Sequence, residues 1–263
     1  MLRSIALLLE YDGRDFCGWQ QQPRQRSVQG VVQAAVQQMT REVTALVGAS
    51  RTDAGVHAVG QVAHFQTRTA IPAVAFALGL NQHLPRDVRV RAAVEVPATF
   101  HARHRAVRKI YRYLMHMAAT PSALLGGRLW HRCGGLRIAA MHAAAQRLCG
   151  AHDFRAFCAS NDRSQHQLRR LERCTVRRVS WDRLWPAYAP QPGHVLVIEC
   201  VGNGFLKQMV RNIVGTLVEV GEGKRSPASM RSVLQSRDRR QAGATAPAEG
   251  LYLVKVEYEP PLW

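Results

Sequence analysis

One carboxylate, Asp53, stands out among the residues of this chain that could carry out chemistry. It lies in the stretch GASRTDAGVHAVGQVAHF (48–65), two residues after Arg51 and two residues before Gly55. In an extended segment, side chains two residues apart leave the same face, so Arg51 can pair with Asp53 and favour its ionised form. An ionised carboxylate can act as a nucleophile or as a base. An Asp next to a glycine is also common in turns, so the spacing alone leaves a structural role open.

The charge balance points to a polyanionic partner. The 263 residues include 36 Lys and Arg against 18 Asp and Glu, a formal net charge of +18, and the excess is spread along the whole chain. This distribution favours nucleic acid over an acidic membrane surface, because most of the basic residues are Arg, whose planar guanidinium matches phosphate geometry. An Arg- and Ala-rich composition that reflects genomic bias is the alternative explanation for part of this excess.

Several classes of protein are disfavoured. The six cysteines form no C-x-x-C pair and the 11 histidines form no H-E-x-x-H motif, so we expect no metal site and a reducing, cytoplasmic environment. No G-x-G-x-x-G or Walker sequence is present, so no nucleotide cofactor is indicated. No stretch approaches 18 apolar residues, so no membrane helix is expected. The apolar run near the N-terminus reaches Glu10 and Asp12 and is more typical of a strand than of a signal peptide.

The elements that must position Asp53 follow from hydrophobic periodicity. In the first part of the chain the pattern predicts strands over 4–13, 61–67 and 88–96, a helix that Ser27 caps, and a helix over 71–84. In the second part it predicts a strand over 108–117, helices over 138–149, 203–221 and 226–238, and strands over 194–201 and 250–258. Gly150, Ser226 and Pro227 are predicted as helix-terminal residues. The stretch from Ala159 to Arg178 is predicted to be an insertion or a mobile loop.

The repeated order of strands and helices predicts an α+β fold with two halves, residues 1–104 and 105–263, each a sheet with helices on one face. Tyr111, Tyr113 and Met115 are expected on one face of the strand over 108–117. Leu206, Met209, Ile213 and further apolar residues form a stripe along the helix over 203–221.

Short motifs along nearly the whole chain resemble, in order and spacing, the tRNA pseudouridine synthases of the anticodon stem-loop. These motifs are GWQQQP (18–23), SVQG (27–30), RTDAGVHAVGQVAHF (51–65), GLNQHLP (79–85), FHARHRAVRKIYRYLM (100–115), HDFRAF (152–157), GNGFLKQMVRNIVGTLVEVG (202–221) and ATAPAEGLYL (244–253). The resemblance implies isomerisation of uridine to pseudouridine at positions 38, 39 and 40 of tRNA, without a cofactor. It also implies two ferredoxin-like halves that share a continuous, mainly antiparallel sheet, a basic active-site cleft between them, and a homodimer.

The same resemblance implies roles for four residues. Asp53 is the expected nucleophile, with base flipping of the target uridine. Tyr111 is expected to stack on the target uracil, although its pattern alone favours a core tyrosine. Arg211 is expected to pair with Asp53, although by pattern it is an ordinary solvated arginine one helical turn after Lys207. Arg51 can also enter the RNA stack in place of the flipped base. His57 and His64 are expected to be structural, since the resemblance implies no catalytic histidine.

The expected phosphate contacts come from basic side chains near these motifs. They are Arg24, Arg26, Arg103, Arg105, Arg108, Lys109 and Lys207, together with His101, His104, Arg169 and Arg170. The chain departs from the family pattern at Ser50, where glycine is usual, at Gln33, where glutamate is common, and in a longer, more polar segment at 159–171.

Two other functions are compatible with a basic α+β protein. A catalytically silent RNA-binding or RNA-folding protein on the same scaffold would keep the basic cleft and would not need Asp53. A nuclease would need paired carboxylates for metal or two suitably placed histidines, and neither pattern is evident. The intact R-T-D-A-G-V-H segment favours the synthase.

Overall fold

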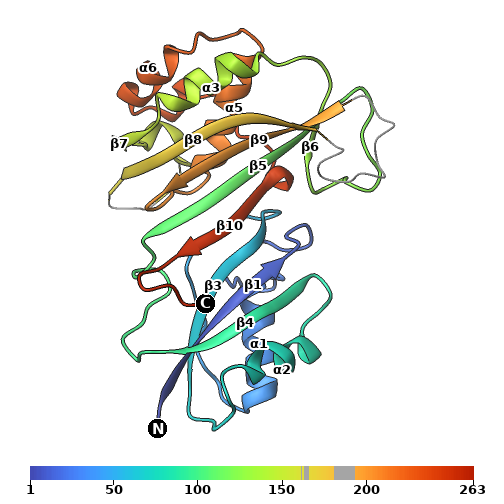
Figure 1. Cartoon of the computed structure of the whole chain (residues 1–263), viewed down its shortest axis with the longest axis vertical. Helices are drawn as coiled ribbons and strands as arrows, with labels where there is room; N and C mark the ends of the chain where they lie inside the picture. Colours follow the sequence, from blue (N-terminus) through green and yellow to red (C-terminus); the bar gives the residue numbers. More distant parts are fainter. Residues whose placement is uncertain (161, 163–165, 181–192) are drawn as a thin grey trace. The chain divides into compact units, whose positions relative to one another are not determined.

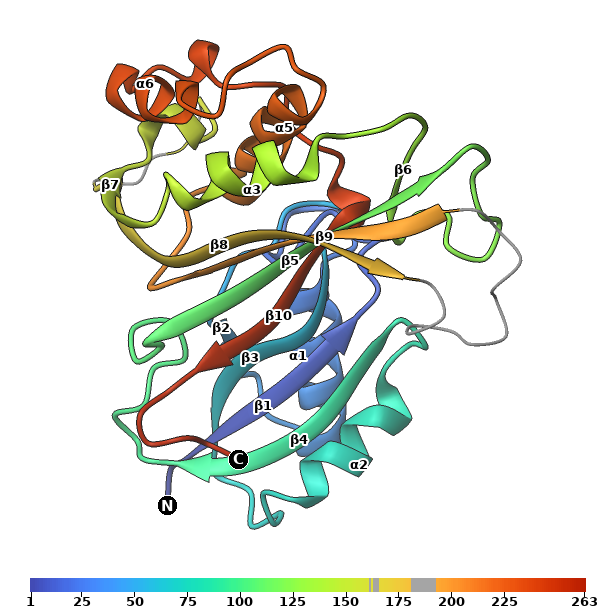
Figure 2. The same cartoon turned by 45° about the horizontal axis from the view of Figure 1, so that its top comes forward.

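The computed structural model describes residues 1–160, 162, 166–180 and 193–263. The chain forms two compact units, which are described separately. The first comprises Met1–Lys109 and Tyr252–Trp263, and the second comprises Ile110–Leu251. Each unit is a sheet with helices on one face (Figures 1 and 2), so the predicted α+β class is confirmed.

The first unit contains the strand that leads away from Asp53. Its sheet has the order β4-β1-β3-β10, with β2 paired to β3. β1 is antiparallel to β3 and β4, whereas β10 is parallel to β3, so the sheet is mixed. The elements are β1 (Arg3–Tyr11), α1 (Val28–Thr40), β2 (Val47–Gly48), β3 (His57–Thr67), α2 (Ala75–His83), β4 (Val88–Val96) and β10 (Leu251–Glu257), whose first residue belongs to the second unit.

The core of the first unit lies between its sheet and the helices α1 and α2. Ile5, Leu7 and Leu9 of β1 are fully buried. Phe65 of β3 packs edge-to-face on Phe76 of α2 with ring centroids 5.4 Å apart. Every predicted element of this unit is present. The predicted cap of α1 is confirmed, because Ser27 Oγ accepts a hydrogen bond from Gly30 N at 3.2 Å.

The second unit has a sheet of order β5-β9-β8-β7, with β6 paired to β5. Helices α3, α5 and α6 lie together on one face of it (Figure 2). β7, β8 and β9 are joined antiparallel, and β6 is parallel to β5. The elements are β5 (Arg108–Ala118), whose first two residues belong to the first unit, β6 (Trp130–Arg132), α3 (Ile138–Gln146), β7 (Gly150–Asp153), β8 (Leu168–Ser180), β9 (Gly193–Gly202), α5 (Met209–Gly221) and α6 (Ser229–Ser236).

The apolar stripe of α5 supplies much of the second core. Met209, Ile213 and Leu217 are fully buried, in agreement with the predicted stripe. Tyr113 and Met115 of β5 are also fully buried, as expected from their alternation.

Two predicted helix starts in the second unit are wrong. α5 begins at Met209, because Gln208 adopts a left-handed conformation with φ of 59° and interrupts any helix that starts earlier. Lys207 therefore precedes the helix. α6 begins at Ser229, because Ser226 uses its backbone oxygen, which accepts from Ser229 N at 3.1 Å across a turn, and its side chain caps nothing.

Two further predictions in the second unit are wrong. α3 ends at Gln146, and turns over residues 147–149 separate it from Gly150, which has φ of +115° and begins β7. Residues 168–178 belong to the long strand β8 and are not an insertion or a loop. Residues 161 and 163–165 of the predicted loop lie outside the described residues. None of the helices in the described ranges is long and apolar enough to cross a bilayer.

Candidate active site

Asp53 lies in a tight turn between β2 and β3 of the first unit. Its backbone forms an isolated antiparallel bridge with Gly18, and its carbonyl oxygen accepts from Val56 N at 3.2 Å. Gly55, with φ of +77°, donates its N–H to Phe16 O at 3.3 Å. Asp53 and Gly55 are thus held by backbone bonds to the segment 16–18. Asp53 is half-buried, so it is partly accessible to solvent.

Thr52 fixes the residue just before Asp53. Its carbonyl oxygen accepts from Trp19 N at 3.0 Å. Its hydroxyl lies 2.8 Å from the hydroxyl of Tyr11, and this hydrogen bond is buried. Trp19 is itself 1% exposed, so this backbone anchor comes from a buried residue. A carboxylate attached to a backbone with these anchors has a defined position, as a reacting group requires.

Arg51 is exposed. Within the described residues it forms no ion pair, so the predicted same-face pairing with Asp53 is absent from this conformation. The pairing needed an extended chain, whereas the backbone turns at Asp53 to form the bond to Val56. Arg51 therefore presents its guanidinium to solvent.

Tyr111 and Arg211 belong to the second unit. Tyr111 is 5% exposed, and its ring packs edge-to-face against Phe205 with centroids 5.0 Å apart. Arg211 lies on α5 and is half-buried, and its Nε donates to Ala246 O at 2.7 Å. Ala246 N in turn donates to Arg211 O at 3.2 Å, so this arginine is tied to the segment before β10. It is not the ordinary solvated arginine that its pattern suggested.

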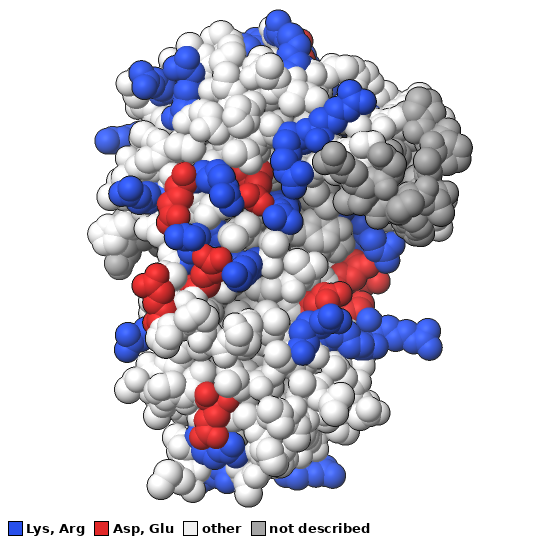
Figure 3. Space-filling view, viewed as in Figure 1, with Lys and Arg blue, Asp and Glu red and all other residues white. Residues whose placement is uncertain are grey.

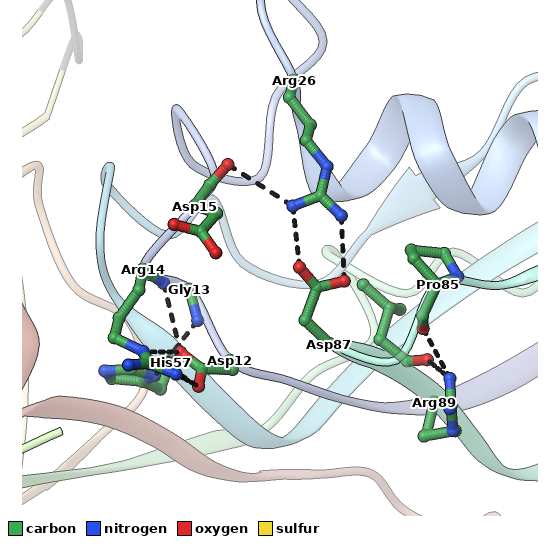
Figure 4. A network of polar contacts seen from close by, with 10 residues as sticks. Asp12, Gly13, Arg14, Asp15, Arg26, His57, Pro85, Asp87 and Arg89 are labelled. Atoms are coloured by element: carbon green, nitrogen blue, oxygen red, sulfur yellow. Dashed lines mark hydrogen bonds and ion pairs between the residues drawn. The ribbon is translucent and has the colours of Figure 1, made fainter. Parts of the chain in front are cut away.

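Several of the predicted phosphate-binding residues have partners inside the protein. Arg26 forms a bidentate ion pair with Asp87, at 2.7 and 2.9 Å (Figure 4). Its guanidinium also lies 4.0 Å above the ring of Phe16. Arg108 pairs with Glu257 at 3.2 Å. Lys109 is buried, and its Nζ donates to Ala49 O at 2.7 Å. The ammonium of Lys109 thus supports the chain ahead of Asp53 and is not on the surface.

Four other basic candidates, Arg24, Arg103, Arg105 and Lys207, are exposed. Within the described residues, the side chains of Arg24, Arg103 and Arg105 form no ion pair. Lys207 is also exposed, and its backbone N–H donates to Asp162 Oδ2 at 3.1 Å. On the face drawn in Figure 3, Lys and Arg are dispersed, and several lie beside acidic side chains. Unpaired guanidinium groups are the ones that can contact phosphate without first breaking an internal ion pair.

His57 and His64 have structural contacts. His57 is buried, its Nδ1 accepts from Gly13 N at 3.1 Å and lies 3.3 Å from Asp12 Oδ1 (Figure 4), and its ring stacks on Tyr252. His64 Nδ1 accepts from Ala102 N at 3.3 Å, and burial lowers the pKa of His64. Both rings hold backbone segments in place.

The described part of the chain contains no group of three or more His, Cys, Asp or Glu side chains arranged to hold a metal ion. Its six cysteines are all free thiols.

The sequence did not predict the residues that form hydrogen bonds to the chain just before Asp53. Tyr11 and Trp19 were read as parts of a strand and a motif, and Gln61 as an ordinary strand residue. In the sequence, Gln61 is a polar residue in a predicted strand with apolar neighbours, and this pattern could have drawn attention to it. In the structure it is fully buried. A buried amide in a core strand indicates specific hydrogen bonds.

Comparison with known proteins shows similarity over nearly the whole chain. The family model described as tRNA pseudouridine synthase matches residues 8–105 and 144–259. A protein from Acetivibrio thermocellus named tRNA pseudouridine synthase A is 43% identical over 257 residues, 98% of this chain and 100% of that protein. Proteins of the same name from Chloroflexus aurantiacus and Citrifermentans bemidjiense are each 46% identical, over 99% and 98% of this chain and 91% and 98% of theirs. The chain therefore belongs to the tRNA pseudouridine synthase family.

Proposed function

We propose that this protein isomerises uridine to pseudouridine in tRNA, at positions 38, 39 and 40 of the anticodon stem-loop. The observation that carries the proposal is the half-buried Asp53 on a turn anchored at Gly18 and Thr52, in a chain that matches the family over nearly its whole length. The net charge of +18 supports a polyanionic substrate.

Uridine and pseudouridine are isomers, so the reaction adds and removes no atoms. The N1–C1′ glycosidic bond of uridine breaks, the freed uracil rotates, and C5 joins C1′ while the C5 proton leaves and N1 gains a proton. Asp53 would serve as the nucleophile at C1′ or at C6, or as the base that removes the 2′ proton. Each route requires an ionised carboxylate, and none requires an oxidant or an energy source.

The target base must leave the helical stack to reach Asp53, which costs a few kcal/mol. We propose that Tyr111 stacks on the flipped uracil, that Arg211 pairs with Asp53, and that Arg51 occupies the space that the base leaves. The edge-to-face contact with Phe205 supports the first role, because it fixes the plane of the Tyr111 ring. The exposure of Arg51 supports the third role, because its guanidinium is available to RNA.

At the level of the fold, we propose two ferredoxin-like halves that share a continuous sheet with a basic active-site cleft between them. We also propose a homodimer that works in the cytoplasm. These proposals rest on the family resemblance. The alternative is a catalytically silent RNA-binding protein on the same scaffold, and it would predict that changes at Asp53 have no effect on its function.

The direct test is to treat unmodified tRNA transcripts with the protein and to map pseudouridine by carbodiimide modification and primer extension. We expect stops at positions 38, 39 or 40 wherever a transcript has uridine there. A transcript in which cytidine replaces those uridines is the matched control. Tight binding of tRNA without any stop would favour the silent alternative.

Replacement of Tyr111 tests the stacking proposal. Tyr111→Leu removes the aromatic ring, and we expect the single-turnover rate to fall by about tenfold to hundredfold, since base–aromatic stacking contributes about 1–3 kcal/mol. Tyr111→Phe keeps the ring and should keep most of that part of the rate. Equal rates for Tyr111→Leu and the wild type would assign Tyr111 to the core alone.

Binding that depends on phosphate contacts must weaken with salt. Between about 50 and 200 mM salt we expect tRNA affinity to fall by orders of magnitude, with a log–log slope set by the number of neutralised phosphates. Arg103→Ala should reduce that slope by about one for the lost contact. The matched control is Arg240→Ala, which also removes one positive charge, because Arg240 is exposed and already paired with Asp238 at 2.8 Å. Identical slopes for both variants would show that Arg103 contacts no phosphate of the tRNA.

A further inference from the structure

The amide of Gln61 lies in the core of the first unit and bonds to the chain just ahead of Asp53. Gln61 belongs to β3 and is 0% exposed. Its Nε2 donates to Ser50 O at 2.6 Å, and its Oε1 accepts from Ser50 N at 3.2 Å and from Val62 N at 3.1 Å. One side chain therefore binds both backbone groups of Ser50.

These bonds begin where the regular sheet ends. β2 pairs with β3 only at Val47 and Gly48, and one more backbone bond follows, from Ala49 N to Val62 O at 2.7 Å. Beyond that point the chain leaves β3, and the carboxamide of Gln61 spans the gap to Ser50. Lys109 Nζ binds Ala49 O from outside this strand pair. Side chains thus extend the ladder after the two backbones separate.

The anchored residues flank the two side chains proposed to act on RNA. Ser50 is held by Gln61, and Thr52 is held by Trp19 N and by the hydroxyl of Tyr11. Arg51 lies between these two fixed points and Asp53 follows the second. A shift of Ser50 would therefore move both groups.

We propose that Gln61 is a positioning residue that fixes the exit of the chain from β2 and thereby the placement of Asp53. This proposal rests on the proposed catalytic role of Asp53. Gln61 itself is buried and touches no reacting atom; it acts through the peptide groups of Ser50. A buried amide at a core position is costly unless its donors and acceptors are bonded, and here both ends of the amide bind this one residue.

The hydrogen-bonding groups of the amide make Gln61→Glu an informative variant, because its effect should depend on pH. A glutamine offers a donor and an acceptor at the same time, whereas a glutamate offers both only when it is protonated. In Gln61→Glu, a protonated carboxyl can donate to Ser50 O and accept from Ser50 N. An ionised carboxylate would place two acceptors against each other where the wild type has a 2.6 Å hydrogen bond. Burial raises the pKa of a carboxyl, so this titration moves toward neutral pH.

The experiment compares single-turnover pseudouridine formation on a tRNA transcript for the wild type, Gln61→Glu and Gln61→Met between about pH 5.5 and 8.5. We expect the ratio of the Gln61→Glu rate to the wild-type rate to increase as the pH falls. Gln61→Met, which has similar size and no donor, should be about 10²-fold slower at every pH, as expected for a displaced reacting group. Thermal unfolding and tRNA affinity, measured under the same conditions, should show folded protein with affinity within a few-fold of the wild type.

The matched control is Gln66→Glu, which places the same new charge on an exposed position of the same strand. Three charged groups lie around this segment and are the same in every variant: Lys109, which binds Ala49 O, and Arg51 and Asp53. Any effect of these groups on the pH profile therefore cancels in the ratio of the variant rate to the wild-type rate. Gln66→Glu should follow the wild-type pH profile. A pH-independent rate ratio for Gln61→Glu, or a wild-type rate for Gln61→Met, would overturn the proposal.

Asp53→Asn, run in the same assay, separates this proposal from the one on which it rests. An Asp53→Asn variant that is inactive at every pH, beside Gln61 variants that are slow and folded, supports both proposals. Activity in Asp53→Asn would refute the catalytic role of Asp53 and, with it, the positioning of Asp53 by Gln61. Inactive Asp53→Asn together with unaffected Gln61 variants would refute the positioning role alone.

Discussion

Asp53→Asn is expected to form no detectable pseudouridine, even with enzyme in excess over tRNA. The substitution preserves the size of the side chain but removes the negative charge that must attack or abstract. Loss of a catalytic nucleophile lowers rates by about 10⁴- to 10⁶-fold. The turn itself should survive, because its anchors at Gly18, Val56 and Phe16 are backbone bonds. Single-turnover assays with primer-extension mapping measure the result.

Asp87→Asn is the matched control, because it makes the same change of charge in the same unit at a carboxylate whose partner is Arg26. Both variants should bind tRNA at least as tightly as the wild type, since each loses a negative charge from a protein that binds a polyanion. Only Asp53→Asn should lose the reaction. Near-normal single-turnover activity of Asp53→Asn would make Asp53 a turn residue and leave the reaction without its proposed nucleophile.

The hydrophobic pattern predicted most elements of the first unit, because β1 and β3 are nearly continuous runs of buried residues and α1 buries Val28, Val32, Ala35 and Val36 at helical spacing. The second unit shows where this reasoning fails. In β8 a bulge between Leu171 and Arg173 places the next buried residue, Cys174, three positions after Leu171. The strict alternation is lost, so a strand was mistaken for a loop.

The start of α5 was missed for a different reason. The apolar spacing continues without a break from Leu206 to Met209, and both residues are buried, so the pattern carries no sign of the left-handed Gln208 between them. Hydrophobic spacing cannot predict a backbone conformation that depends on tertiary contacts. The same limit applies to Gln61 and Lys109, whose hydrogen-bond partners lie 11 and 60 residues away in the chain.

The candidate nucleophile, by contrast, could be identified from sequence, because it lies within a compact motif. The structure adds the neighbours that hold it, which come from separate segments around Tyr11, Gly18 and Gln61. The same contacts also make the motif sensitive to small changes in those segments.

Gly18→Ala is expected to lower the rate strongly, although it removes no polar group from the site. Gly18 has φ of +112°, and a Cβ built on it would lie 2.6 Å from Thr52 O, which is backbone and cannot swing aside. The segment 52–53 must therefore shift, and a displacement of about 1 Å at a reacting group can cost about 10²-fold in rate. We expect a loss of that size in kcat at saturating tRNA.

Gly134→Ala separates this contact from backbone strain. Gly134 also has a positive φ, +85°, but a Cβ there would meet no described atom within 4 Å outside its chain neighbours. An alanine in either position has a disfavoured backbone conformation, of the order of 1 kcal/mol or more. Both variants should therefore lose some thermal stability, whereas only Gly18→Ala should lose kcat. Equal kcat values in the two variants, each folded at the assay temperature, would mean that the contact of Gly18 with Thr52 does not set the position of Asp53.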